Sequence, residues 1–321
     1  MPSQPQNNEG HPGASGDPVQ ALEELFVQLN GLILGKNRQI ELAMVCLLAG
    51  GHLLIDDVPG VGKTTLSHGL AISLGLQYGR VQFTADLMPS DLTGGSVLDP
   101  QAQRFVFHPG PVFNQLLLAD EINRAGPKTQ GALLEAMEER QVSVDNVTHP
   151  LPQPFFVIAT QNPLDQRGTY ALPESQLDRF LMSISLGYPS REAERAMLTG
   201  VSRRSLLSGL RTVLPPPLLA QIQQRVATVH ASAPVLDYLQ NLIAATRSGQ
   251  WFVHGLSPRA ALALLGAARA HAWLAGRSHV APDDIQAILL PCAAHRLTAL
   301  PSSGRSARDQ LQLMMDRIEV V

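Results

Sequence analysis

Short apolar segments alternate with amphipathic stretches between residues 18 and 188, and this pattern predicts buried strands separated by helices. Most of these segments carry few polar side chains and are followed by polar or turn-forming residues, as expected of a strand that is buried on both faces. The segments lie at 53–55, 81–83, 116–119, 155–159 and 181–186. We expect an α/β fold in which a mainly parallel five-stranded sheet is covered by helices on both faces.

The stretches around these strands carry weaker patterns. Residues 1–17 are rich in Pro, Gly, Asn and Ser and almost free of apolar side chains, which predicts a disordered tail. Amphipathic helices are expected from residue 18 and over 39–49. Residues 84–95 are predicted to be a loop or irregular segment. The alternating stretch 104–107 precedes a Pro-Gly-Pro turn and predicts a short hairpin or a protruding loop.

Residues 189–321 are rich in Ala and Leu and show helical periodicity without a convincing strand. Ser257 and Pro258 are suited to the N-cap and the first position of a helix, and Pro291 is expected to kink a later one. Helices are predicted at 191–200, 217–229, 234–248, 257–276 and 281–297. We therefore expect an α/β core over 18–188 and a small all-α domain over 189–321.

A glycine-containing loop follows the first predicted strand and leads into a helix. Gly60 and Gly62 let the backbone curl so that several N–H groups point at one anion. Lys63 supplies a positive charge for the β- and γ-phosphates of a nucleotide, and Thr64 offers a hydroxyl to a magnesium ion. Strand, glycine loop, Lys-Thr and helix together predict a phosphate-binding site.

This loop departs from the usual phosphate-loop pattern at Asp57, which stands where the pattern begins with glycine. The start of the loop therefore cannot depend on a glycine with positive φ. The part from Gly60 to Thr64 is intact, so we keep the prediction of a nucleotide site. Its expected nucleotide-binding residues are Val58, Pro59, Gly60, Val61, Gly62, Lys63, Thr64 and Thr65.

Polar side chains also follow two other predicted strands. Asp120 and Glu121 end the strand at 116–119, and Asn162 follows the strand at 155–159. Because the carboxyl ends of parallel strands form the ligand-binding edge of such a sheet, we expect these side chains beside the phosphate loop. Asp120, together with Thr64, would hold Mg²⁺. Glu121 would orient or deprotonate a water molecule, and Asn162 would help to position it. An Asn-Pro pair alone is more often a plain turn.

Composition narrows the functional classes only a little. The chain has 24 Lys and Arg against 27 Asp and Glu, a net charge of −3, which argues weakly against a dedicated nucleic-acid binder. Cys46 and Cys292 lie in apolar surroundings and are predicted to be buried free thiols in a reducing compartment. No apolar run approaches the length of a membrane span, and no signal-peptide core is recognisable, so the cytoplasm is the expected location.

These motifs together resemble the MoxR family of AAA+ ATPases over nearly all of residues 33–297. The stretches that carry the resemblance are 57–64 (DVPGVGKT), 116–141 (LLLADEINRAGPKTQGALLEAMEERQ), 159–163 (ATQNP), 172–180 (LPESQLDRF) and 256–260 (LSPRA). The resemblance implies a five-stranded AAA+ core with a helical lid, assembled into a ring that is often hexameric. It also implies that residues 91–111 form an insert facing the pore of that ring.

The resemblance implies roles for individual residues as well. Lys63 and Thr64 match the Walker A motif, Asp120 and Glu121 match Walker B, and Asn162 matches sensor 1. Arg179 matches the arginine finger, which reaches the γ-phosphate in a neighbouring subunit; taken alone, an arginine before a strand is more often a surface ion-pair residue. Arg259 matches sensor 2 on the lid, where it would couple the nucleotide held by the phosphate loop to the domain angle. Ile33 and Leu34 fall where such proteins contact adenine.

The function implied is Mg²⁺-dependent ATP hydrolysis that remodels or activates a partner protein. MoxR-like proteins look like chaperones for partners with von Willebrand factor A domains and are linked with cofactor or metal insertion. Two alternatives are another kind of AAA+ motor, either a helicase-like nucleic-acid motor or a magnesium-chelatase-like motor subunit, and a nucleotide-dependent scaffold with negligible turnover. The presence of both Glu121 and Arg179 disfavours the scaffold. ATPase assays with and without DNA would separate the remaining two.

Overall fold

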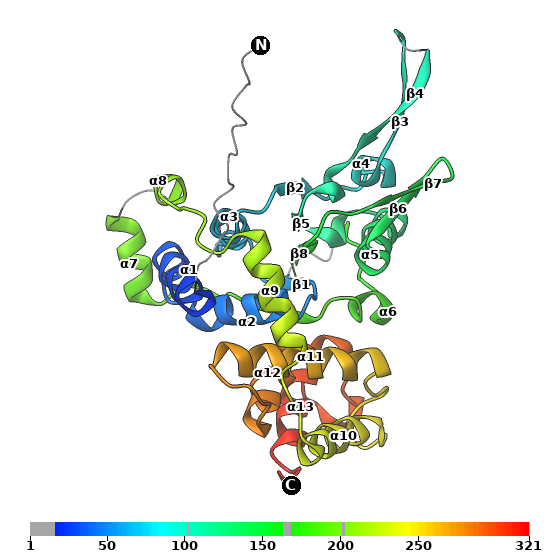
Figure 1. Cartoon of the computed structure of the whole chain (residues 1–321). Coiled ribbons are helices and arrows are strands. Elements are labelled where there is room, and N and C mark those ends of the chain that lie inside the picture. Colours follow the sequence, from blue (N-terminus) through cyan, green and yellow to red (C-terminus); the bar gives the residue numbers. More distant parts are fainter. Residues whose placement is uncertain (1–16, 102, 163–167, 201–202, 321) are drawn as a thin grey trace, which may run out of the picture.

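The computed structural model describes residues 17–320 apart from 102, 163–167 and 201–202, so only Asp17 of the predicted tail lies among the described residues. Figure 1 shows the α/β part in the upper half of the view and a bundle of helices below it, with the C-terminus at the far end of the bundle. Helix α9 (Pro216–Ala227) runs between the two parts. The predicted order, an α/β core followed by a helical domain, is confirmed.

The core is a five-stranded parallel sheet with the strand order β2-β5-β8-β1-β9. Its strands are β1 (Leu53–Asp56), β2 (Tyr78–Gln82), β5 (Leu116–Asp120), β8 (Phe156–Gln161) and β9 (Met182–Ile184). All five were predicted, although β2 begins at Tyr78 rather than at residue 81. Because every pair is parallel, the ends of β1, β5 and β8 meet at the same edge of the sheet.

Alternate residues of the strands enter two separate hydrophobic clusters, one on each face of the sheet. Leu53 and Ile55 of β1 pack in a cluster that continues into the helical bundle. It contains the buried faces of α1 (Pro18–Leu32), α2 (Asn37–Leu48) and α3 (Lys63–Leu74). Leu54 points to the other face, where Phe83 and the buried residues of α5 (Pro127–Glu139) lie. Since successive side chains of a strand point to opposite faces, helices are needed on both sides.

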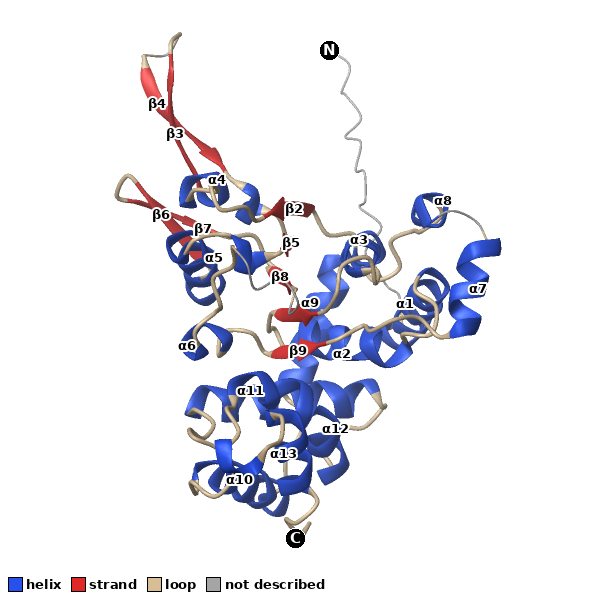
Figure 2. Cartoon of the chain, turned by 180° about the vertical axis from the view of Figure 1, so that it is seen from behind, coloured by secondary structure: helices blue, strands red, loops and turns tan. Residues whose placement is uncertain are grey.

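The helices agree with the predicted periodicity in most places. The α-helices are α1 (Pro18–Leu32), α2 (Asn37–Leu48), α3 (Lys63–Leu74), α4 (Pro89–Thr93), α5 (Pro127–Glu139), α6 (Glu174–Leu177), α7 (Arg191–Thr199), α8 (Arg203–Ser208), α10 (Ala233–Arg247), α11 (Pro258–Leu274), α12 (Pro282–Ala293) and α13 (Ala307–Met315). Short 3₁₀ turns are η1 (Pro111–Phe113), η2 (Ile122–Arg124), η3 (Ala294–Arg296) and η4 (Pro301–Ser303). Figures 1 and 2 both show α7 and α8 beside α1, on the α/β part of the molecule rather than within the bundle.

Some local predictions need correction. The segment 84–95 contains helix α4, because the Asp91 carboxylate accepts a hydrogen bond from the Met88 N–H at 2.8 Å and caps the helix. Helices α8 and α13 were not predicted. The predicted helix at 281–297 ends at Ala293 and continues as a 3₁₀ turn, with Pro291 inside its last turn. The Ser257 hydroxyl does accept the Ala260 N–H at 3.0 Å, so the predicted N-cap of α11 is confirmed.

Two β-hairpins project from the same side of the core (Figures 1 and 2). The first, β3 (Gly94–Asp99) with β4 (Arg104–Pro109), confirms the hairpin expected between residues 91 and 111. The second, β6 (Gln141–Val144) with β7 (Val147–Pro150), was missed, although its Asp-Asn turn has the positive φ values that hairpin turns favour. The hairpins touch where the His149 ring stacks on Phe107, with centroids 3.9 Å apart.

The two cysteines are free and buried, as predicted. Burial raises the pKa of the Cys292 thiol to about 12 and that of Cys46 well above its usual value. Both thiols are therefore protonated at neutral pH and unreactive. None of the described helices is long and apolar enough to cross a membrane.

Candidate nucleotide-binding site

The glycine loop lies at the carboxyl end of β1 and leads into α3. Gly60 has a φ of +86° and Gly62 a φ of +106°, so the loop uses the conformations that only glycine adopts at little cost. The Lys63 ammonium lies against this loop and donates a hydrogen bond to the Asp57 carbonyl oxygen at 2.7 Å. Burial lowers the pKa of Lys63, and the neighbouring carboxylates of Asp120 and Asp57 counteract this shift.

Asp57 explains why this loop does not begin with glycine. Its buried carboxylate accepts hydrogen bonds from the Ser185 hydroxyl at 3.0 Å and from the Gly187 N–H at 2.6 Å. The other oxygen accepts the Val58 N–H at 2.8 Å. The loop is thus tied to the chain that leaves β9, on the neighbouring strand of the sheet. The aspartate replaces the conformational freedom of glycine with three side-chain hydrogen bonds.

Thr160 connects the two acidic residues at the end of β5. Its hydroxyl donates to Asp120 Oδ1 at 2.7 Å and accepts the Glu121 backbone N–H at 2.8 Å. Glu121 has a φ of +57°, and this left-handed turn directs its side chain away from the strand axis. One buried hydroxyl therefore sets both the rotamer of Asp120 and the backbone direction at Glu121. Sequence reasoning did not identify Thr160 as a site residue.

Two further side chains reach the acidic pair from the edge strand β2. Arg80 Nη2 lies 2.8 Å from Asp120 Oδ2, and Gln82 Nε2 donates to Glu121 Oε2 at 2.8 Å. Glu121 also pairs with Arg124 Nε at 2.8 Å. Sequence analysis missed these partners. Arg80 and Gln82 are two residues apart, so both side chains lie on one face of a strand, and this could have marked them as a pair. That their strand lies beside β5 is decided by the order of strands in the sheet.

A cavity of about 340 Å³ brings these groups together. It is lined by Pro59, Gly60, Gly62, Lys63, Thr64, Thr65, Arg80, Gln82, Asp120, Glu121 and Asn162. Nine of these residues were predicted for nucleotide, metal or water chemistry, and they converge from the ends of β1, β5 and β8. A helix N-terminus, a lysine and loop amides beside two carboxylates are suited to a nucleotide phosphate group rather than to a neutral ligand.

The donor set fits Mg²⁺ in combination with phosphates. Thr64 and Asp120 supply hard oxygen ligands at the same cavity. In the described part of the chain no group of three or more His, Cys, Asp and Glu side chains could hold a metal alone. Mg²⁺ is commonly held by one or two carboxylates plus nucleotide phosphates and water, so this sparse set matches its preference.

The residues predicted to contact adenine do not reach this cavity. Ile33 is buried in the hydrophobic cluster that includes α1, α2 and α3, and the next residue, Leu34, is partly buried. Neither is among the residues that line the phosphate cavity within the described ranges. Their role toward the base stays a prediction.

The two arginines carried over from the resemblance lie together, away from the phosphate loop. Arg179 Nη2 is 3.0 Å from Glu138 Oε2, and Arg259 Nη2 binds the other oxygen of the same carboxylate. The described lining of the phosphate cavity includes neither arginine. The start of α11 lies beside the Arg179 segment, where Ser257 bonds to Asp178, and the role of Arg259 toward a nucleotide stays a prediction.

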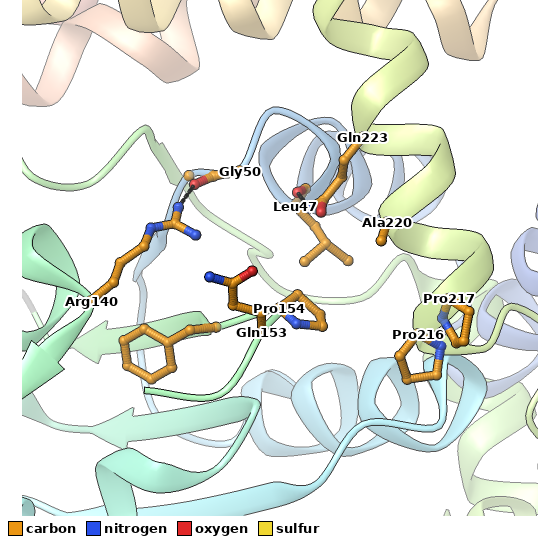
Figure 3. A pocket seen from close by; sticks show the side chains of 11 residues that line it. Leu47, Gly50, Arg140, Gln153, Pro154, Pro216, Pro217, Ala220 and Gln223 are labelled. Carbon is orange, nitrogen blue, oxygen red and sulfur yellow. Dashed lines mark hydrogen bonds between the residues drawn. The ribbon is translucent and has the colours of Figure 1, made fainter. Parts of the chain in front are cut away.

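A second cavity, of about 350 Å³, lies at the opposite end of the sheet and is shown in Figure 3. It lies between the Gly50-Gly51 turn before β1, the segment before β8 and the first turns of α9. Arg140 donates to the Gly50 carbonyl oxygen at 2.8 Å across its margin. Because these residues precede the strands and the phosphate loop follows them, this cavity cannot contribute to the nucleotide site.

Comparison with known proteins agrees with this fold and site. A family model described as "ATPase family associated with various cellular activities (AAA)" matches residues 52–182, and an "AAA lid domain" model matches residues 244–313. The fold matches a crystal structure of a protein from Cytophaga hutchinsonii ATCC 33406, with a TM-score of 0.86 and 32% identity over 95% of this chain and 96% of that one.

Curated relatives cover most of the chain. The chain is 43% identical to the uncharacterized protein YeaC of Bacillus subtilis (strain 168), over 91% of this chain and 92% of that protein. It is 39% identical to chaperone MoxR1 of Mycobacterium tuberculosis, over 87% and 76%, and 34% identical to protein MoxR of Paracoccus denitrificans, over 85% and 87%.

The fold, the phosphate loop and the acidic pair define a P-loop ATPase of the AAA+ class. Within that class, the chain belongs to the MoxR family.

Proposed function

We propose that the protein hydrolyses ATP with Mg²⁺ and uses the cycle, as a ring of subunits, to remodel a partner protein. The observation that carries the proposal is the convergence of Lys63, Thr64, Asp120, Glu121 and Asn162 on one cavity. The chaperone-like role is supported by the relative named chaperone MoxR1. Six subunits, a partner with a von Willebrand factor A domain, metal or cofactor insertion and a cytoplasmic location are parts of the same proposal.

Within one subunit the residues divide into binding and chemistry. The amides of the loop, Lys63 and Thr64 hold the phosphates, and Asp120 with Thr64 would hold Mg²⁺, which neutralises phosphate charge when bound. Glu121 and Asn162 orient the attacking water. The Glu121 carboxylate is held by Gln82 and Arg124, and the Thr160 hydroxyl accepts the backbone N–H of Glu121. Its position is therefore established before the nucleotide arrives.

The arginines complete the site from outside the subunit. Arg179 and Arg259 both bind Glu138. Neither is among the described residues that line the phosphate cavity of the same subunit. We propose that both act on the γ-phosphate held by the next subunit, where they stabilise the negative charge that develops during phosphoryl transfer. A finger supplied by a neighbour makes turnover depend on assembly.

Mixing two inactive variants tests this proposal. Arg179→Ala should bind ATP but hydrolyse it at a rate roughly 1,000-fold or more below that of the parent. Lys63→Ala should not bind ATP. In mixed rings the intact pocket of an Arg179→Ala subunit can face the intact arginine of a Lys63→Ala subunit. Activity should return in the mixture, and the specific activity of the parent should rise with protein concentration. No rescue and no concentration dependence would assign Arg179 a structural role.

The partner can be sought with the Glu121→Gln variant, which should hold ATP without turning it over and so keep a bound partner. Capture of a protein with a von Willebrand factor A domain, in ATP but not in ADP, is the expected result. DNA added to the ATPase assay is the matched comparison. Stimulation by DNA, without capture of a protein, would favour a nucleic-acid motor instead.

A further inference from the structure

Glu138 binds two arginines that come from distant parts of the chain. It stands in the last turn of α5, whereas Arg179 follows α6 and Arg259 lies in the first turn of α11. Each carboxylate oxygen takes one guanidinium. The side chains of Glu138 and Arg179 are 30% and 29% exposed and that of Arg259 is 51% exposed, so all three remain accessible from solvent.

Contacts that do not include Glu138 hold the segments that carry the two arginines next to each other. Asp178 accepts a hydrogen bond from the Ser257 hydroxyl, the N-cap of α11, at 3.0 Å. Its other oxygen lies 3.0 Å from Nε of Arg296, whose side chain is only 4% exposed. Arg296 also donates to the Phe180 carbonyl oxygen at 2.7 Å. These bonds join Asp178 to the N-cap of the helix that carries Arg259, and they join Asp178 and Phe180, on either side of Arg179, to η3 of the lid.

This arrangement has two kinds of contact with different strengths. The Asp178–Arg296 contact is mostly shielded from water and supported by backbone acceptors, so it should persist. The ion pairs of Glu138 are partly exposed and each contributes little, so they can exchange for a better anion. Two guanidinium groups that converge on one point repel each other unless an anion lies between them, and in the isolated subunit Glu138 supplies that anion.

We propose that Glu138 is a placeholder for the γ-phosphate of the neighbouring subunit. It keeps the arginine pair together and neutralised until an ATP-loaded neighbour displaces it. This inference rests on the proposed function, because it requires the arginines to act on a neighbour. If Glu138 is a placeholder, its contact with the arginines competes with assembly of the site that the phosphate loop of one subunit forms with the arginines of the next.

Competition by Glu138 should be measurable as a change in the protein concentration at which the specific ATPase activity is half-maximal. Removing the charge of Glu138 eliminates the anion that competes with the γ-phosphate of the neighbour. The residues of the phosphate loop and both arginines remain unsubstituted. Glu138→Gln should reach half-maximal specific ATPase activity at about three- to tenfold lower protein concentration, the effect expected of two partly exposed ion pairs. Its activity at saturating protein should equal that of the parent, because the phosphate replaces Glu138 in the active state.

Glu139→Gln is the matched control, because it removes the same charge from the neighbouring exposed position of α5 and should leave the concentration dependence unchanged. Glu138→Asp keeps the charge on a side chain too short to reach both arginines equally, and should shift the midpoint in the same direction by less. Thermal melting of all variants shows whether each is folded, and either substitution at Glu138 can serve if the other is not.

Two outcomes would overturn the placeholder role. If Glu138→Gln and Glu138→Asp leave the midpoint where it is, Glu138 does not compete with assembly. If they lower the activity at saturating protein instead, Glu138 stays bound to the arginines during catalysis and is a permanent positioning residue. In both cases the rescue between Arg179→Ala and Lys63→Ala subunits would still occur. Loss of that rescue marks failure of the proposed function itself, and the placeholder role falls with it.

Discussion

Thr160 and Asp120 form a buried hydrogen bond of 2.7 Å between neighbouring strands, and the same hydroxyl accepts the N–H of Glu121. The bond runs from β8 to β5, so the sheet itself orients the residue proposed to hold Mg²⁺. The backbone of the proposed catalytic glutamate is held by the same atom. A single side chain thus links the proposed metal ligand to the proposed catalytic residue.

Thr160→Val should slow ATP hydrolysis by about tenfold to a hundredfold, because it removes this hydroxyl while keeping the shape of the side chain. The Glu121 N–H would lose its partner, and Asp120 would keep its contact with Arg80 but lose the bond that fixes its other oxygen. Thr160→Ser is the control, since it retains the hydroxyl and should retain most of the activity. Steady-state ATPase rates at saturating ATP and protein measure the effect. A fully active Thr160→Val would show that the bond is structural only.

Lys63→Ala and Glu121→Gln should separate binding from chemistry. Lys63→Ala removes the main cation of the phosphate loop, so ATP affinity should fall sharply. Glu121→Gln keeps the size of the side chain and should bind ATP like the parent, while hydrolysis slows by a factor on the order of 100 to 10,000. Binding of a fluorescent ATP analogue and phosphate release are the two measurements. Parent-like binding and turnover in both variants would place the site elsewhere.

Asp57→Gly, which restores the glycine usual at this position, should destabilise the protein rather than improve it. The substitution removes hydrogen bonds to Ser185, Gly187 and Val58, and their loss is expected to cost about 2 to 4 kcal/mol. Asp57→Asn retains one acceptor oxygen and should fall between the two. Urea unfolding gives the free energies, and ATP affinity should decrease in the same order. A glycine variant as stable as the parent would contradict this account of the loop.

The buried His52 ring should make the stability of the folded protein depend on pH in the acidic range. Its Nδ1 accepts the Val157 N–H at 3.0 Å, so the proton sits on Nε2, which faces the Met137 carbonyl oxygen at 3.3 Å. Burial lowers the pKa of His52 from 6.5 to about 4. Between these values the unfolded chain is protonated and the folded chain is not. Stability should therefore fall as the pH drops from about 6.5 to 4, by roughly 3 kcal/mol at most for this group.

Unfolding by urea across this pH range measures the slope. His52→Gln should be less stable at neutral pH but should lose less stability on acidification. His108→Gln is the control, because His108 is exposed on the β3–β4 hairpin and its replacement should leave the slope unchanged. An equal slope in parent and His52→Gln would assign the acid sensitivity to other groups. Buried His295 is one of these, since burial lowers its pKa to about 3.

The sequence by itself determined the features that depend on local chemistry. Buried parallel strands are continuous apolar runs, so β1, β5 and β8 were recognisable, whereas the edge strand β2, with its polar Arg80 and Gln82, was located only in part. The phosphate loop was recognisable because Gly60 and Gly62 must adopt positive φ and because Lys63 and Thr64 stand at a fixed spacing in front of a helix. The place of Asp120, Glu121 and Asn162 beside that loop followed from one rule, that parallel strands share their carboxyl edge.

The tertiary structure decided what depends on contacts between distant segments. That Asp57 meets Ser185, that Arg80 meets Asp120, and that Thr160 holds Asp120 all follow from the strand order, which no local pattern encodes. The arginines are the clearest case. Their sequence context indicated a role for each separately, but their meeting on Glu138 depends on how the lid packs against the core. Such packing is the sum of many weak long-range contacts, and it therefore becomes visible only in the folded chain.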